Sequence, residues 1–183
     1  MIEITTPLAK DQVQDLHVGD CVVLSGYVYT ARDAAHLRFC RAIELREDLP
    51  IDIRNQVIYY AGPTPAGPGR AIGSLGPTTS SRMDFCTPQL LERGLRGMIG
   101  KGERSPRVRE AIEKFKGVYL VATGGAGALL SQYIKEAKVV AYEDLEPEAV
   151  YRLLVVKMPL IVAIDCYGRD IFEEEKSKWR RKS

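Results

Sequence analysis

The sequence lacks closely spaced cysteines, a basic and apolar N-terminal segment, and an uninterrupted apolar run of membrane-spanning length. Its four cysteines stand at positions 21, 40, 86 and 166, without a C-x-x-C pair. Such wide spacing is not that of a metal-binding or redox motif, and it predicts free thiols in a cytoplasmic protein. The longest apolar stretch, 153–166, is interrupted by Lys157, Pro159 and Asp165, so we expect no membrane-spanning helix.

A strong excess of charge of either sign is also missing. The chain has 26 basic and 24 acidic residues, which gives a net charge of +2. A balance this close does not indicate non-specific binding to nucleic acid. The length of 183 residues suffices for one domain with a substantial core. We assign residues 1–170 to that domain and residues 171–183 to a charged C-terminal helix or tail.

Hydrophobic periodicity predicts a single α/β domain with many short strands. Strands and helices alternate in the second half of the chain, whereas the first half is richer in strands. This pattern indicates a layered mixed domain and not a fully doubly wound fold. The predicted strands are 1–6, 21–30, 57–61, 71–75, 97–100, 118–122, 138–142, 152–156 and 160–165. The predicted helices are 8–16, 33–45, 87–93, 108–115 and 128–135, with a loop at 62–69 and a helical turn within 144–151.

One stretch is unusually rich in hydroxyl groups: Gly76-Pro77-Thr78-Thr79-Ser80-Ser81-Arg82-Met83-Asp84. Gly-Pro predicts a sharp turn, after which Ser80 or Ser81 is expected to cap a helix with Asp84 in its first turn. A helix start with free N–H groups, hydroxyls and an arginine can bind an anion. A capped helix with a solvated Arg82 explains the same residues equally well.

A second polar cluster, residues 30–36 (Thr-Ala-Arg-Asp-Ala-Ala-His), lies at a predicted strand-to-helix junction. Asp33 is the expected N-cap, Arg32 stands at the strand end, and His36 lies one turn into the helix. A surface ion pair between Arg32 and Asp33 is the plainer interpretation. A lone histidine is more often structural than catalytic.

Two further clusters are rich in glycine. Lys101 stands between two glycines, which let the backbone approach a ligand, although an exposed turn lysine is common. Gly124 and Gly125 follow a predicted strand and open a helix, a context that favours anion binding by backbone N–H groups. The cluster is neither G-x-G-x-x-G nor a Walker A motif, and tight helix–strand packing explains it at least as well.

Three cations, Arg32, Arg82 and Lys101, therefore stand beside turns rich in glycine or hydroxyl groups. Two guanidinium groups and an ammonium suit a small ligand with two carboxylates, because arginine binds carboxylate in bidentate fashion. Phosphate would suit them nearly as well. The residue pattern alone thus predicts an anion-binding α/β protein.

The four clusters together resemble a known family, the β subunits of two-subunit, iron–sulfur-dependent (class I) fumarate hydratases and L-tartrate dehydratases. In one-chain members the resemblance is to the C-terminal domain. It covers nearly the whole chain, and the basic tail after Asp170 is the part that we do not expect to be shared. The matching segments, in the family's order, are 30–36, 76–84, 98–102 and 124–126.

The resemblance implies a swivelling β/β/α domain and a hydro-lyase that reversibly hydrates fumarate to L-malate. It equally allows tartrate dehydration to oxaloacetate. It implies a 4Fe-4S cluster held by three cysteines of a separate α subunit, so that this chain binds none alone and is inactive alone. The implied assembly is an αβ pair, or a dimer of such pairs. An exposed apolar surface on the α-facing side would let isolated chains self-associate.

The resemblance also gives roles to individual residues. Thr78 is implied as the base that removes the C3 proton of malate, and the α subunit would supply the acid. A stand-alone anion-binding regulatory module is the more distant alternative. The implied substrate-binding residues are Arg32, Thr78, Thr79, Arg82 and Lys101, and the supporting residues are Asp33, His36, Gly124 and Gly125.

Overall fold

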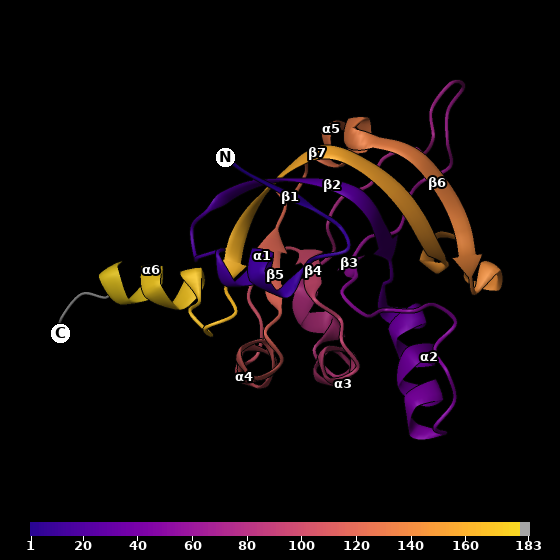
Figure 1. The fold of residues 1–183 in the computed structure, drawn as a ribbon. Coiled ribbons are helices and arrows are strands. Elements are labelled where there is room, and N and C mark those ends of the chain that lie inside the picture. Colours follow the sequence, from indigo (N-terminus) through magenta and orange to yellow (C-terminus); the bar gives the residue numbers. More distant parts are fainter. Residues whose placement is uncertain (180–183) are drawn as a thin grey trace.

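The computed structural model describes residues 1–179 as seven strands, six α-helices and three short 3-10 helices (Figure 1). The strands are β1 (Ile2–Thr5), β2 (Cys21–Thr30), β3 (Val57–Tyr59), β4 (Gly97–Gly100), β5 (Val118–Val121), β6 (Ile134–Ala141) and β7 (Val150–Ile164). The α-helices are α1 (Lys10–Gln14), α2 (Asp33–Glu44), α3 (Thr87–Glu92), α4 (Pro106–Phe115), α5 (Gly127–Leu130) and α6 (Ile171–Trp179). The 3-10 helices are η1 (Ser80–Met83), η2 (Ser131–Tyr133) and η3 (Glu143–Glu148).

All seven strands belong to one mixed sheet of order β1-β2-β3-β4-β5-β7-β6, and β7 also pairs with β2. The pairs from β1 to β5 are parallel, whereas β7 is antiparallel to β2, β5 and β6. Because the long strand β7 joins β2 to β5, it closes the sheet on itself. The arch of β2, β7 and β6 lies over the shorter strands β3, β4 and β5 (Figure 1).

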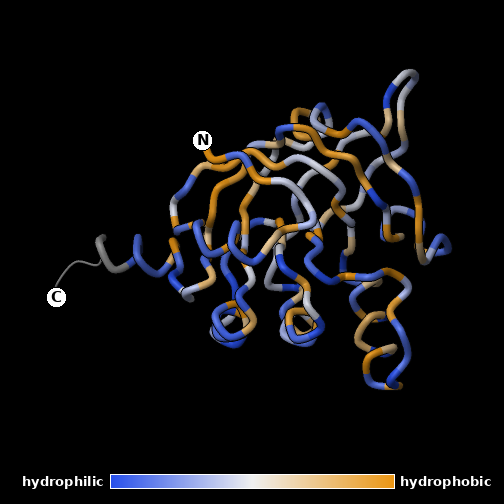
Figure 2. Tube along the Cα trace, in the orientation of Figure 1, coloured by the Kyte–Doolittle hydropathy of each residue, from blue (hydrophilic) through white to orange (hydrophobic). Residues whose placement is uncertain are grey.

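Alternation of side chains along the central strands separates two hydrophobic cores. On β3, Val57 and Tyr59 point into the space enclosed by the sheet, where they pack with Leu24 and Leu153. The intervening Ile58 belongs to the other core, which faces the helices. Successive side chains of a strand point to opposite faces, so a strand that is buried on both faces is apolar at every position, as β3 is. Figure 2 shows hydrophobic residues along the strands.

Helices α2, α3 and α4 cover the outer face of β3, β4 and β5 (Figure 1). Each contributes apolar side chains to the second core, for example Phe39 from α2, Leu90 from α3 and Ile112 from α4. The molecule therefore has three layers: the arch of β2, β7 and β6, the strands β3, β4 and β5, and the helices. The predicted α/β class and its β/β/α layering are confirmed.

Three predictions of local structure are wrong. Residues 71–75 form no strand, because their backbone instead bonds to the loop at Thr64 and to Gly127. The helix predicted over 128–135 ends earlier, and β6 already begins at Ile134. The strands predicted at 152–156 and 160–165 are one strand, since β7 continues past Lys157 and Pro159.

The charged segment at the C-terminal end begins as helix α6. Lys176 on this helix pairs with Glu103 at 2.6 Å, next to the turn that follows β4. Residues 180–183 of the predicted tail lie outside the described residues, and the division at residue 170 stays a prediction. Within residues 1–179, every helix is too short or too polar to cross a lipid bilayer.

Candidate functional site

The predicted polar segments meet at the carboxyl edge of the four parallel strands β2, β3, β4 and β5. Their ends are level, because Thr30 pairs with Tyr59 and Gly100 with Val121. Arg32 follows β2, Lys101 follows β4 and Gly124 follows β5. The carboxyl ends of parallel strands are where α/β sheets bind ligands. The topology thus brings together residues that are far apart in the sequence.

The hydroxyl-rich stretch runs along this edge and is fixed by backbone bonds. The Thr78 N–H donates to the carbonyl of Tyr60 at 2.7 Å, and the Ser80 N–H donates to the carbonyl of Lys101 at 3.0 Å. Thr79 forms a parallel bridge with Lys101. Thr78 is half-buried and Thr79 is exposed, and no described residue forms a hydrogen bond with the Thr78 hydroxyl. Thr78 therefore sits on rigid backbone with its hydroxyl available.

The predicted capping roles of Ser80, Ser81 and Asp84 are wrong. The helix that follows is the single 3-10 turn η1, and its N-cap residue, Thr79, makes no side-chain cap bond. Ser80 is buried, and its hydroxyl accepts the Lys101 N–H at 3.0 Å. Asp84 follows η1, and its carboxylate accepts the N–H of Ser105, the N-cap residue of α4, at 2.6 Å. Asp84 thus serves the start of a different helix.

Arg82 and Arg32 share one carboxylate. Asp33 Oδ1 accepts from Arg82 Nε at 2.8 Å, and Asp33 Oδ2 lies 3.8 Å from an Arg32 terminal nitrogen. Asp33 is the first residue of α2, with Arg32 as N-cap, which corrects the prediction that Asp33 caps this helix. Glu148 takes over part of the capping by accepting the Ala34 N–H at 2.8 Å. Asp33 therefore orients Arg82, whereas Arg32 is shared between Asp33 and Glu148, which lies 3.6 Å from it.

Buried polar atoms without a hydrogen-bond partner concentrate in this region. In the part of the chain that the structure describes there are four such side-chain atoms, and three belong to Arg32 (Nε), Asp33 (Oδ2) and His36 (Nε2). Buried polar groups are otherwise satisfied in folded proteins. Gly62 makes room for Arg32, because a Cβ there would lie 3.1 Å from its Cδ. Three of the four such atoms therefore belong to the single segment 32–36.

The glycine turn after β5 lies against the lysine turn after β4. A Cβ on Gly124 would be 3.6 Å from Lys101 Cδ. Gly125 has a φ of +77°, a left-handed backbone that favours glycine. Gly127 packs on Gly76, because a Cβ on Gly127 would lie 3.0 Å from the Gly76 nitrogen. All four predicted segments are therefore neighbours, although the roles predicted for their residues stay predictions.

His36 is a buried, neutral histidine at the base of this region. Burial, the largest effect, lowers its pKa to about 4, although a hydrogen bond to the Arg32 backbone acts in the opposite direction. His36 Nδ1 lies 2.8 Å from the Arg32 carbonyl, an acceptor, so Nδ1 carries the proton. The ring thereby fixes the backbone at Arg32.

Acid is therefore expected to destabilise the protein through His36. The pKa of His36 is near 4 in the folded protein and 6.5 in the unfolded chain. The contribution of its neutral ring to the free energy of unfolding is therefore fully present above pH 6.5. This contribution, about 3 kcal/mol, is lost as the pH falls from 6.5 towards 4. His36→Asn keeps a donor for the Arg32 carbonyl but cannot titrate. Urea unfolding between pH 7 and 4 should show a shallower loss for the variant, and parallel curves would contradict the assignment.

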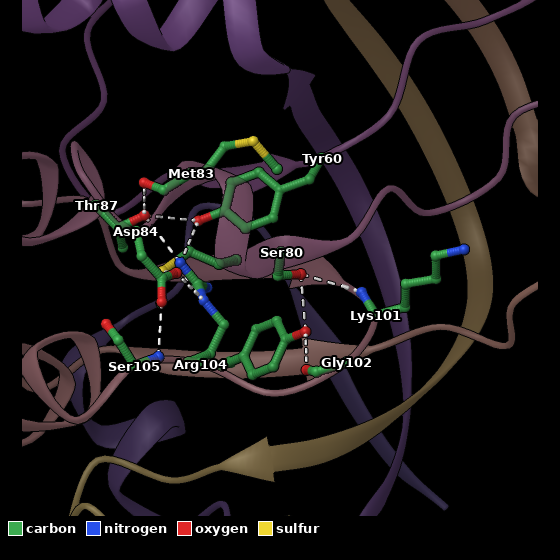
Figure 3. Close-up of polar contacts among 11 residues, drawn as sticks. Tyr60, Ser80, Met83, Asp84, Thr87, Lys101, Gly102, Arg104 and Ser105 are labelled. Carbon is green, nitrogen blue, oxygen red and sulfur yellow. Dashed lines mark hydrogen bonds and ion pairs between the residues drawn. The ribbon is translucent and has the colours of Figure 1, made fainter.

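Sequence reasoning missed a buried polar network behind the site (Figure 3). Its centre is Arg104, whose side chain is 0% exposed and donates from Nε to Asp84 Oδ1 at 2.7 Å. A terminal nitrogen of Arg104 donates to Thr87 at 2.9 Å, and its guanidinium carbon lies 5.1 Å from the ring centre of Tyr60 and 4.9 Å from that of Tyr119. Burial alone lowers the pKa of Arg104, but Tyr60 and Asp84 raise it on balance, so the charge is kept.

The described residues do not fit a metal cluster. No group of three or more cysteine, histidine, aspartate or glutamate side chains among them lies close enough together to hold a metal ion. Cys21 is exposed, Cys166 is buried, and burial raises the pKa of Cys86. Among the described residues, the four cysteines are therefore dispersed, and none of them lies in a group of metal ligands.

An α/β domain with three cations and a hydroxyl-rich segment at the carboxyl edge of its parallel strands has the arrangement that anion-binding α/β domains use. The model of one family, Fumarase C-terminus, matches residues 1–175. The chain therefore belongs to the Fumarase C-terminus family, and the resemblance drawn from the four segments is confirmed.

Individual relatives fall into two groups by length. A protein of Methanocaldococcus jannaschii, provisionally named L(+)-tartrate dehydratase subunit beta, is 38% identical over 93% of this chain and 91% of its own. The L(+)-tartrate dehydratase subunit beta of Escherichia coli K12 is 34% identical over 94% of this chain and 87% of its own. The aerobic class I fumarate hydratase of Salmonella typhimurium is 36% identical over 96% of this chain. The chain spans only 31% of that enzyme's length.

Proposed function

We propose that this chain is the β subunit of a hydro-lyase that reversibly hydrates fumarate to L-malate. The convergence of Arg32, Arg82 and Lys101 at one sheet edge carries the proposal, because a four-carbon dicarboxylate needs cations at both ends. The membership of the family and the names of the relatives, hydratases and dehydratases, support the reaction type.

The cations bind and orient the substrate in this proposal. Asp33 occupies only Nε of Arg82, so the terminal nitrogens of Arg82 stay available for a bidentate carboxylate. The side chain of Arg82 is 50% exposed, and an exposed ion pair of this kind is weak enough for a substrate carboxylate to compete with it. Arg32 and Lys101 bind the remaining carboxylate oxygens, and the exposed Thr79 lies beside them.

Thr78 acts as the base. In the dehydration direction, the C3–H bond of malate breaks, its proton passes to Thr78 Oγ1, and the C2 hydroxyl leaves as water with a proton from the α subunit. A threonine hydroxyl is a poor base, so nearby cations must favour its alkoxide in a site closed to water. Lys101, whose backbone is bridged to that of the adjacent Thr79, is one such cation.

The α subunit completes the site. Two relatives that match over most of their length are named subunit beta, which supports a partner chain. We place the 4Fe-4S cluster implied by the family on that partner.

Activity is therefore expected only from the assembled pair. The purified chain should not turn over fumarate, malate or tartrate, whereas co-expression with the α subunit and cluster reconstitution should restore turnover. Fumarate hydration is measured by the loss of its ultraviolet absorbance. Robust turnover by the chain alone, or none by a reconstituted pair, would overturn the proposal.

L-Tartrate is the second candidate substrate. Two relatives that match this chain over 87% or more of their own length are named as tartrate dehydratase subunits, which supports tartrate as a candidate substrate. Both substrates are four-carbon dicarboxylates that fit the same cations. Comparing kcat/KM of the assembled pair for fumarate, malate and tartrate decides between the two.

A further inference from the structure

The hydroxyl groups of two buried residues, Ser80 and Tyr119, form hydrogen bonds with the turn that carries Lys101. The Tyr119 hydroxyl lies 2.8 Å from Ser80 Oγ and 2.8 Å from the carbonyl oxygen of Gly102. One phenol has a single proton, and the Gly102 carbonyl can only accept. The phenol therefore donates to Gly102, and the Ser80 hydroxyl donates to the phenolic oxygen. Burial raises the pKa of Tyr119, which keeps this proton in place.

The same serine also receives a bond from the lysine. Ser80 Oγ accepts the Lys101 N–H at 3.0 Å. The bonds then run in one direction, from the Lys101 N–H through Ser80 and Tyr119 to the Gly102 carbonyl. They hold the backbone on both sides of the Lys101 side chain. Gly100 leaves the space for this arrangement, since a Cβ there would lie 1.9 Å from Ser80 Oγ.

Arg104 connects this hydroxyl chain to the segment that carries Thr78. Its guanidinium lies between the rings of Tyr119 and Tyr60, within 5.1 Å of both ring centres. The carbonyl of Tyr60 accepts the Thr78 N–H at 2.7 Å. A buried cation between two aromatic rings gains attraction from both faces. The two tyrosines that hold Lys101 and Thr78 therefore pack on one fixed charge.

We propose that the hydrogen-bonded hydroxyls of Ser80 and Tyr119, the hydroxyl relay, position Lys101 for the substrate carboxylate. Arg104 links this relay to the segment that carries Thr78. The proposal rests on the proposed function for the identity of the ligand. None of the three side chains touches the substrate. They are positioning residues, and their effect is on where the ammonium group of Lys101 is held.

The kinetic test uses Tyr119→Phe and Ser80→Ala in the assembled αβ enzyme. Each variant breaks the relay but keeps Lys101, so KM for the dicarboxylate should rise roughly five- to tenfold while kcat changes less. The double variant should be no worse than the stronger single variant, because the two hydroxyls act as one unit. Tyr167→Phe, which removes a phenol donating to the Gln14 carbonyl at 3.1 Å, is the matched control and should match the wild type.

A second readout separates this proposal from the proposed function. Hydrogen exchange of the Lys101 amide is followed by mass spectrometry on the assembled protein. It should be faster in Tyr119→Phe and in Ser80→Ala than in the control Tyr167→Phe. Unchanged exchange would overturn the relay whatever the activity. Faster exchange with an unchanged KM would overturn its positioning role. If the wild-type pair turns over none of the three substrates, the proposed function fails, and the exchange rates still decide the relay.

Discussion

Replacing Thr78 by alanine is expected to lower kcat of the assembled enzyme by roughly two to four orders of magnitude, the usual contribution of a positioned acid or base. Binding should weaken only modestly, because the proposed substrate contacts of Arg82 and Lys101 do not involve Thr78. The backbone should not change, since the Thr78 N–H to Tyr60 carbonyl bond does not involve the side chain. Steady-state kinetics with malate, in which kcat and KM are separated, measures both effects.

Two companion variants sharpen this experiment. Thr78→Ser keeps the hydroxyl and should retain most of the activity. Ser81→Ala removes an exposed hydroxyl from the same segment. Because Ser81 has no proposed role in the site, this variant should behave like the wild type. A Thr78→Ala enzyme within tenfold of the wild-type kcat would show that another group removes the C3 proton.

Most of the fold could be predicted because its strands are short, apolar and bounded by turns. Strand β2 begins and ends at the predicted residues, and α2 differs by one residue at its end. The errors arise where tertiary pairing overrides local signals. Pro159 suggested a break in β7, yet it pairs with Val23 of β2, and Lys157 adopts a φ of +54° without ending the strand.

The candidate site was predictable in part for a similar reason. Arg32 and Lys101 follow predicted strands directly, and the structure shows these strands to be parallel, so both residues lie at one edge of the sheet. Arg104 was missed because it ends a charged run, Lys101-Gly102-Glu103-Arg104, that reads as exposed. Its burial depends on Asp84, which is distant in sequence and was assigned to a helix cap. No local pattern distinguishes such an arginine from a solvated one.

The pair of Asp84 and Arg104 should matter most for stability. Asp84→Ala would leave a guanidinium that is 0% exposed without its carboxylate, and would free the Ser105 N–H at the start of α4. Removing one partner of a buried ion pair costs about 3–5 kcal/mol, because the other charge stays buried and unpaired. Urea unfolding of the purified chain, followed by circular dichroism, measures this loss in the free energy of unfolding.

The double variant Asp84→Ala/Arg104→Met tests the cause. If the unpaired charge is responsible, replacing Arg104 by a methionine of similar length should recover most of the lost stability, since apolar replacements of buried pairs are often neutral. Asp144→Ala is the surface control. The Asp144 carboxylate pairs with Arg38 but is 65% exposed, so its removal should lower the free energy of unfolding by no more than about 1 kcal/mol. If Asp84→Ala lowers the free energy of unfolding as little as the control does, the buried arginine finds another partner or reaches water. An equally unstable double variant would assign the loss to the freed start of α4 instead of the charge.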